Sequence, residues 1–405
     1  MKRFKFASLL IAAILLLPCM SCLSACDSSY DVVLNVYNWG EYISDGSYES
    51  LDVNKAFEQW YYEYTKANSE DGKGVRVKIN YDTYDSNESL RAKLESGSAS
   101  YDVIIPSDYM IDYFIEHDML LELNFDNIPN FEKNIPEQFR NLFYDPDNKF
   151  SVPYTYGMVG IVYDTNIVKG IEPDEVTWDL MWDGDYAKQI LQFDNSRDAF
   201  GTAMYKLKIN VNSTNRDDWY SAYEELAEQK PKLKRYVMDQ VFNMMESGDA
   251  AIAAYYAGDC ITMMENSAEN VSLQFGYPRD DEGNICTNLF MDAMCIPTCA
   301  KNKEVAEAYI NFMLDTDVEI GGEHYDVARA NAEYIYYATP NSAVYDNPEY
   351  QEALGKGDEE CDYYEMLYPE GFDFAASYNE FAYANLDPEL LAYISDLWLD
   401  LKLLN

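Results

Sequence analysis

Strands and helices alternate along this chain, and the alternation begins twice. In the first stretch, apolar β-rich segments and amphipathic segments follow one another in strict order. The pattern predicts strands at 32–37, 75–81 and 101–106, and helices at 52–67, 87–94 and 108–117. Such an order favours a parallel sheet with crossover helices.

The pattern restarts after a stretch that contains Pro136 and Pro153. The predicted strands are 159–163, 189–193, 250–255, 272–276 and 289–296, and the helices are 196–207, 216–228, 239–246, 303–314 and 388–403. About 380 residues follow residue 25, which is more than one hydrophobic core usually holds. We therefore expect an α/β protein with two lobes, and a ligand that sits at the carboxyl ends of the strands.

The N-terminus has the features of an export signal. A basic start precedes an apolar run at 7–18, which is too short to span a membrane permanently. Leu23-Ser24-Ala25-Cys26 then resembles the cleavage and lipidation site of bacterial lipoproteins. We expect residues 1–25 to be a lipoprotein signal peptide, Cys26 to carry acyl chains on the outer face of a membrane, and 26–31 to be a tether. The alternative is an ordinary secretory signal that is cut elsewhere.

The net charge is −43 at pH 7, from 72 acidic and 29 basic residues. Such a charge repels nucleic acid and anionic membrane surfaces and attracts cations. It favours a cationic ligand, although solubility explains it equally well.

Two histidines and eight cysteines limit the chemistry that the chain can support. A Ser-His-Asp triad or a histidine-rich metal site is hard to build from so few histidines. The cysteines beyond Cys26 form no CxxC pair, and their number is odd. We expect them to be buried apolar residues with at most one disulfide, and we expect no cofactor.

Aromatic residues stand beside carboxylates where most of the predicted strands end. The segments concerned are 37–42, 106–109, 194–198, 255–259, 289–292 and 336–341. An alkyl ammonium uses both groups, because a ring face attracts the cation and a carboxylate accepts its N–H donors. The basic exception is Arg197, for which we expect a salt bridge to a nearby acid. Asp108 and Asp194, taken singly, are typical of helix N-caps.

Several sequence motifs follow one another along the chain, with gaps, from about residue 32 to residue 400. The motifs are Tyr37-Asn38-Trp39-x-Glu41-Tyr42, Tyr81-x-Thr83-Tyr84-x-Ser86-Asn87-Glu88, Tyr101-Asp102-Val103-Ile104-Ile105-Pro106-Ser107-x-Tyr109, Pro153-Tyr154-x-x-Gly157, Asp292-Ala293-Met294-x-Ile296-Pro297, Ala300-Lys301-Asn302-Lys303-Glu304 and Thr339-Pro340-Asn341. In this order they are similar to the motifs of the spermidine/putrescine-binding proteins of bacterial polyamine ABC importers.

This resemblance implies a two-lobed periplasmic-binding-protein-like fold with hinge strands and a ligand cleft between the lobes. The first lobe would comprise 32–157 and 291–345, and the second would comprise 158–290 and 346–405. The crossovers would lie near Gly157, Met291 and Tyr345.

The resemblance also implies roles for residues in that cleft. Trp39 and Tyr42 would be aromatic walls, with Glu41 a nearby acid. Ser107 and Tyr109 would offer polar contacts, and Tyr337 would line the cleft. Asp198 would grip an amine where the family has glutamate, and Asp292 would bind a central amine.

The chain departs from the family pattern at three predicted ligand positions. Asn195 replaces an aspartate that holds an end amine, and Tyr256 and Phe290 each replace a tryptophan. Asp259, where the family has serine, could restore the lost charge. We find no counterpart of a late cleft glutamine near 363–374.

The resulting hypothesis is a monomeric substrate-binding lipoprotein, not an enzyme, that captures spermidine or putrescine and delivers it to an ABC transporter permease. One alternative keeps the binding role but changes the ligand to another cationic molecule or to a metal held by Tyr336 and Tyr337. A second alternative is a surface glycoside hydrolase that uses Asp194 and Asp198 as paired carboxylates.

Overall fold

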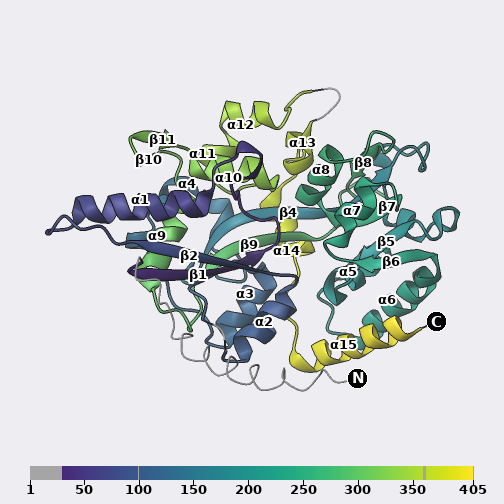
Figure 1. Cartoon of the computed structure of the whole chain (residues 1–405). Coiled ribbons are helices and arrows are strands. Elements are labelled where there is room, and N and C mark those ends of the chain that lie inside the picture. The colour runs from purple at the N-terminus through teal and green to yellow at the C-terminus, as the bar shows by residue number, and fades with distance from the viewer. Residues whose placement is uncertain (1–29, 99, 359–361, 405) are drawn as a thin grey trace, which may run out of the picture.

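The computed structural model describes residues 30–98, 100–358 and 362–404, so the predicted signal peptide and lipidation site lie outside the described residues. Nine strands form one continuous sheet in the order β2-β1-β3-β9-β4-β7-β5-β6, with β8 paired to β4. A separate hairpin joins β10 and β11. Figure 1 shows the strands of the first half on the left, those of the second half on the right, and β4 and β9 between them.

The first half confirms the predicted alternation. Strands β1 (Val32–Trp39), β2 (Val77–Tyr84) and β3 (Val103–Ile104) are parallel, and they alternate with helices α1 (Val53–Asn68), α2 (Asn87–Glu95) and α3 (Asp108–Glu116). Helix α1 begins where Asp52 accepts a hydrogen bond from the Lys55 amide. Ser86 caps α2, because its hydroxyl accepts a hydrogen bond from the Ser89 amide.

The second half repeats the arrangement. Strands β5 (Ile190–Phe193), β6 (Leu233–Val237) and β7 (Ile252–Tyr256) are joined by parallel pairing, and the helices around them are α5 (Ser196–Lys206), α6 (Arg216–Gln229), α7 (Gln240–Glu246) and α8 (Ala257–Glu265). Strand β8 (Leu273–Gly276) pairs antiparallel with β4. Strand β6 was not predicted. It is an edge strand in which exposed Lys234 and Arg235 obscure the apolar pattern.

Two strands join the halves. Strand β4 (Ser151–Asp164) is buried along all 14 residues, and it pairs first with β9 (Leu289–Cys295) and then with β7 and β8. Strand β9 in turn pairs with β3 through Cys295 and Ile104. The two-lobed α/β fold is therefore confirmed, and Gly157 and Met291 lie within the joining strands.

The remaining elements cover the two halves. The helices are α4 (Pro129–Asn134), α9 (Lys303–Met313), α10 (Val327–Ile335), α11 (Ser342–Tyr345), α12 (Pro348–Ala353), α13 (Tyr363–Leu367), α14 (Phe374–Phe381) and α15 (Pro388–Leu403), and the hairpin strands are β10 (Val318–Ile320) and β11 (Glu323–Tyr325). Short 3₁₀ helices are Ser47–Glu49, Phe125–Asn127, Glu137–Phe139, Pro173–Glu175, Trp178–Trp182, Gly184–Tyr186 and Lys230–Lys232.

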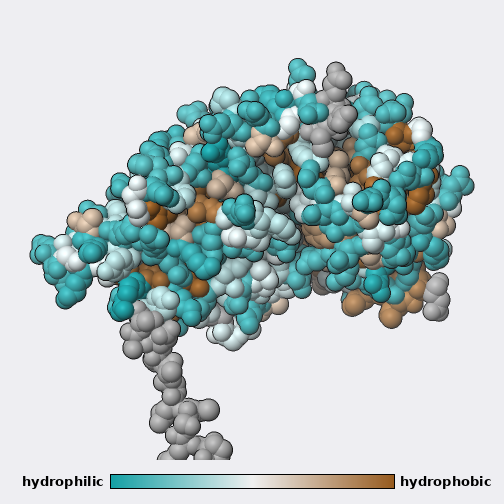
Figure 2. Space-filling view, turned by 45° about the horizontal axis from the view of Figure 1, so that its top comes forward, coloured by the Kyte–Doolittle hydropathy of each residue, from teal (hydrophilic) through white to brown (hydrophobic). Residues whose placement is uncertain are grey.

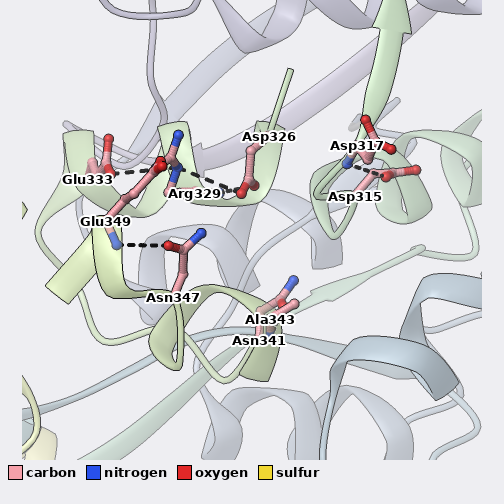
Figure 3. A network of polar contacts seen from close by, with 9 residues as sticks. All are labelled: Asp315, Asp317, Asp326, Arg329, Glu333, Asn341, Ala343, Asn347 and Glu349. Carbon is pink, nitrogen blue, oxygen red and sulfur yellow. Dashed lines mark hydrogen bonds and ion pairs between the residues drawn. The ribbon is translucent and has the colours of Figure 1, made fainter. Parts of the chain in front are cut away.

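The chain beyond α11 contacts both halves. Helix α12 packs against α10 and α11, whereas α15 packs against α5 and α6. Arg329 of α10 forms ion pairs with Glu349 of α12, with Asp326 directly before α10, and with Glu333 within α10 (Figure 3). Helix α14 packs against β9 and thus lies at the junction of the halves.

The cysteines are buried or half-buried, as expected. Cys260, Cys286, Cys295 and Cys299 are free, so none of these four forms the disulfide that the sequence allowed. Cys361 lies outside the described residues.

Hydrophilic residues cover most of the face seen in Figure 2, and the hydrophobic ones lie in separate patches. Among the described residues, no helix combines the length and the apolar character that crossing a membrane requires.

Candidate functional site

A cavity that is open to solvent lies where the two halves meet. Residues of both halves and of the joining strand β9 line it. They include nine aromatic residues, which are Trp39, Tyr42, Tyr84, Tyr109, Tyr255, Tyr256, Phe290, Tyr337 and Tyr383. They also include seven carboxylates, which are Asp85, Glu88, Asp108, Asp198, Asp239, Asp259 and Asp292. Arg197 is the one basic side chain among the described lining residues.

The first-half wall begins at the end of β1. Trp39 is the last residue of that strand, and its ring centroid lies 4.6 Å from that of Tyr84 at the end of β2. The Trp39 Nε1 atom is buried and has no hydrogen-bond partner among the described residues. Tyr109, in the first turn of α3, donates its hydroxyl proton to Glu88 Oε1 at 3.0 Å. This wall therefore combines flat rings with hydrogen-bonding groups.

Asp292 lies on the floor of the cavity, and its side chain is 4% exposed. The Tyr42 hydroxyl donates to Asp292 Oδ2 at 2.8 Å, whereas Oδ1 is buried without a partner among the described residues. Burial raises the pKa of Asp292 to about 6, although the polar side chains of Ser107 and Tyr42 oppose this rise. A buried carboxylate with one free oxygen is suited to accept an N–H from a cation.

The second-half wall is built around Asp198 at the start of α5. Asp198 Oδ2 accepts hydrogen bonds from the Tyr256 hydroxyl and from Asn195 Nδ2, both at 2.6 Å. The pKa of Asp198 is raised above its ordinary value by burial, and the hydrogen bonds from Tyr256 and Asn195 make this rise smaller. The Tyr256 ring centroid lies 5.5 Å from that of Phe290 in β9. The second-half wall is therefore in contact with the β9 residues that form the floor of the cavity.

Arg197 does not form the predicted salt bridge. No carboxylate lies within 4 Å of its guanidinium in the described part of the chain. The group instead donates to the carbonyl oxygens of Val211 and Ala384 and lies 4.5 Å from the Tyr383 ring centroid. The prediction was wrong because buried carbonyl groups and rings already surround this cation.

Asp259 and Asp239 form a second acidic group in the cavity. Burial raises the pKa of Asp259 to about 7, with further increases from the negative charges of Asp239 and Glu41, while a hydrogen bond from Tyr337 lowers it. Burial also raises the pKa of Asp239, and the charge of Asp85 from the first half adds to this. Neither Asp259 nor Asp239 has an ion-pair partner in the described ranges. A positive ligand would relieve this repulsion.

The structure brings together all but one of the predicted ligand residues. Those that line the cavity are Trp39, Tyr42, Ser107, Tyr109, Asn195, Asp198, Tyr256, Phe290, Asp292 and Tyr337. Glu41 is exposed and is not among the lining residues, although its charge acts on Asp259. Its backbone φ of 51° lies in the left-handed region.

Two predicted helix caps are wrong. Asp108 is buried and accepts hydrogen bonds from the Tyr378 hydroxyl at 2.6 Å and the Met291 amide at 3.0 Å. Burial raises the pKa of Asp108 to about 7. Asn195 caps α5, accepting from the Asp198 amide at 2.8 Å, and Asp194 forms an ion pair with Lys402 outside the cavity.

The same geometry bears on the alternatives. Asp194 and Asp198 do not face one another across the cavity, so the imagined glycosidase pair is absent from it. Tyr336 and Tyr337 also diverge, because Tyr337 lines the cavity while the Tyr336 ring packs 6.1 Å from that of Tyr363. Among the described residues, no group of three or more His, Cys, Asp or Glu side chains could hold a metal ion.

Sequence reasoning missed several lining residues that the chain brings in from afar. Tyr383, beyond α14, packs so closely that a Cβ atom added to Gly201 would lie 2.1 Å from its hydroxyl oxygen. The absence of a side chain at Gly201 is what admits this ring, and a glycine inside a helix is a signal for such close packing. Asn288 was also missed, although it stands two residues before Phe290 in the alternation of β9.

Known proteins that are similar to this chain are solute-binding proteins. The sequence model of the family described as bacterial extracellular solute-binding protein matches residues 59–355. The chain is 31% identical over 324 residues to the spermidine/putrescine-binding periplasmic protein of Salmonella typhimurium, covering 80% of this chain and 81% of that one. It is 32% identical over 328 residues to the protein of the same name from Escherichia coli, with 80% and 81% covered.

Solved structures are similar as well. A structure from Listeria monocytogenes named for a spermidine/putrescine ABC transporter superposes with a TM-score of 0.73 at 31% identity, covering 92% of this chain and 99% of that one. The spermidine/putrescine ABC transporter substrate-binding protein PotD from Streptococcus pneumoniae gives a TM-score of 0.66 at 30% identity, with 91% and 98% covered.

Proposed function

The chain belongs to the bacterial extracellular solute-binding proteins, and from this premise we propose that it captures polyamines and delivers them to an ABC transporter permease. Membership of this family confirms the expectation of a solute-binding protein. Relatives named for spermidine and putrescine support the choice of ligand.

One observation carries the proposal. Among the described residues, seven carboxylates, nine aromatic residues and one guanidinium line a cavity between the two halves. The carboxylates accept the N–H donors of an ammonium, and the ring faces attract its charge and cover the methylenes between amines. An anionic solute would meet mostly repulsion there, because no lining carboxylate forms an ion pair with a basic side chain in the described part of the chain.

The proposed mechanism is closure of two lobes around the ligand. The lobes are 32–157 with 291–345 and 158–290 with 346–405, and β4 and β9 are the strands about which they would move. Ligand contacts from both lobes favour the closed form, and the permease would bind that form preferentially. A single copy suffices, since one chain supplies both walls of the cavity.

A thermal-shift comparison tests the ligand class. We expect spermidine and putrescine at millimolar concentration to raise the melting temperature, because a ligand that binds only the folded state stabilises it. Glutamate, maltotriose and ferric citrate should leave it unchanged. A shift with the oligosaccharide or with iron, and none with an amine, would favour one of the alternative functions instead.

We further propose that Cys26 is lipidated and anchors the protein to the outer face of the membrane. The sequence Leu23-Ser24-Ala25-Cys26 after an apolar run supports this. Replacement Cys26→Ser should move the protein from the detergent phase to the aqueous phase in Triton X-114 partitioning, because no acyl chain is then attached. A Cys286→Ser variant serves as control and should stay in the detergent phase. Equal partitioning of Cys26→Ser and the unmodified sequence would contradict lipidation at this residue.

A further inference from the structure

Asn288 is a buried polar residue of the cavity that no role described above explains. Its side chain is 4% exposed and lines the cavity directly before β9. The amide oxygen Oδ1 is buried and has no hydrogen-bond partner among the described residues. Burial of a polar group without a hydrogen bond costs free energy, so a residue of this kind calls for a partner that the protein itself does not supply.

The position of Asn288 on the cavity floor is set by strand alternation. Asn288, Phe290 and Asp292 all line the cavity, because alternate residues of a strand point to the same side. Asp292 lies toward the first half, where it bridges to Ser107. Asn288 lies toward the second half, since its carbonyl accepts from the Val159 amide and Val159 pairs with Tyr256.

The floor therefore contains two buried acceptor atoms without a hydrogen-bond partner among the described residues, Asn288 Oδ1 and Asp292 Oδ1, and Phe290 stands between these two residues in the sequence. Three residues lie between the two positions, and the four residue steps of extended backbone correspond to about 13 Å. An alkyl chain that carries an N–H donor near each end, with methylenes over Phe290, satisfies both acceptors.

Resting on the proposed function, we infer that Asn288 is a ligand-binding residue whose amide oxygen accepts an N–H from an amine nitrogen other than the one at Asp292. Asn288 supplies an acceptor without adding another negative charge to a cavity that already holds seven carboxylates. It also distinguishes an amine from an alkyl group at this point, because only the amine can donate to it.

Replacement Asn288→Leu keeps the approximate size and removes the acceptor. Titration calorimetry with spermidine at pH 8 should show a dissociation constant about tenfold higher than that of the unmodified protein, the effect of losing one hydrogen bond to a charged group. The melting temperature of the ligand-free variant should be unchanged or higher, because a buried unpartnered amide is gone. A purely structural role for Asn288 would not produce this combination.

Asn288→Asp is the second variant, and it keeps an acceptor while adding charge. It should bind spermidine at least as tightly as the unmodified protein. Asn270→Asp adds the same charge at an exposed position outside the cavity and should change affinity less than twofold.

An Asn288→Leu affinity within twofold of the unmodified protein overturns the inference, as does loss of binding in Asn288→Asp. If the unmodified protein binds no polyamine, the proposed function fails, and the inference fails with it. The two failures are distinguishable, because only the second appears before any residue is changed.

Discussion

Replacement Asp292→Ala should weaken spermidine binding by about 2–4 kcal/mol, which is the usual cost of removing one partner of a desolvated charge pair. Asp292 is 4% exposed, and its Oδ1 atom has no other partner among the described residues. An amine at this point would lose its counter-charge in a place where water cannot replace it. Titration calorimetry of the variant and the unmodified protein measures the difference directly.

The same variant should remain folded. Tyr42, which donates to Asp292, also lies within hydrogen-bond distance of the Thr155 hydroxyl, so it keeps a partner when the carboxylate is removed. The melting temperature without ligand should therefore not fall, whereas the shift that spermidine produces should disappear. Asp400→Ala removes an exposed carboxylate on α15 and should leave affinity intact. Unchanged affinity in Asp292→Ala would refute the role assigned to this carboxylate.

Polyamine affinity should fall at least tenfold between pH 8 and pH 5. The pKa of Asp292 is raised to about 6 and that of Asp259 to about 7, both chiefly by burial. Both groups are charged at pH 8 and mostly neutral at pH 5, and each unit of pH below a pKa weakens binding to the charged form about tenfold. An alkyl ammonium, like that of lysine, keeps its charge across this range. Titrations at pH 5, 6, 7 and 8 measure the effect.

The contribution of these two carboxyl groups to the stability of the ligand-free protein should increase as the pH falls, whereas polyamine affinity should decrease. The folded-state pKa of each of these two groups lies above the ordinary aspartate value of 3.8, so their contribution to stability is complete below that value. The contribution is lost as the pH rises through about 6 to 7.

The double variant Asp259→Asn with Asp292→Asn should bind polyamine weakly, and its affinity should depend little on pH. Equal affinity of the unmodified protein at pH 5 and pH 8 would contradict the assignment of these carboxylates to the amine site.

The alternation of strands and helices was predictable because it depends on local periodicity, and most elements lie where the periodicity placed them. Strand β4 shows the limit. Only its second half was predicted, because Pro153 argues against a central strand. The structure accommodates this proline beside an irregularity in the pairing of β4 with β9, between Pro153 and Thr155. That accommodation depends on the partner strand, which local sequence does not reveal.

The site was predictable where strand ends carry a recognisable pairing of ring and carboxylate, as at Trp39, Asp198 and Asp292. It was not predictable where a side chain is set by a distant partner. The local sequence predicts that Asp108 caps a helix. In the structure, the hydroxyl of Tyr378, 270 residues away, donates a hydrogen bond to the Asp108 carboxylate beside the cavity. Asp239 likewise enters the cavity only because the two halves bring the end of β6 close to Gly40.

Calorimetric titration of the protein lacking its signal peptide with spermidine and putrescine at pH 8 tests the central claim most directly. The cavity lined by carboxylates and rings predicts saturable binding of one amine molecule per chain with a dissociation constant in the micromolar range or below. Absence of binding by either amine, together with saturable binding of a neutral or anionic solute, would contradict the account.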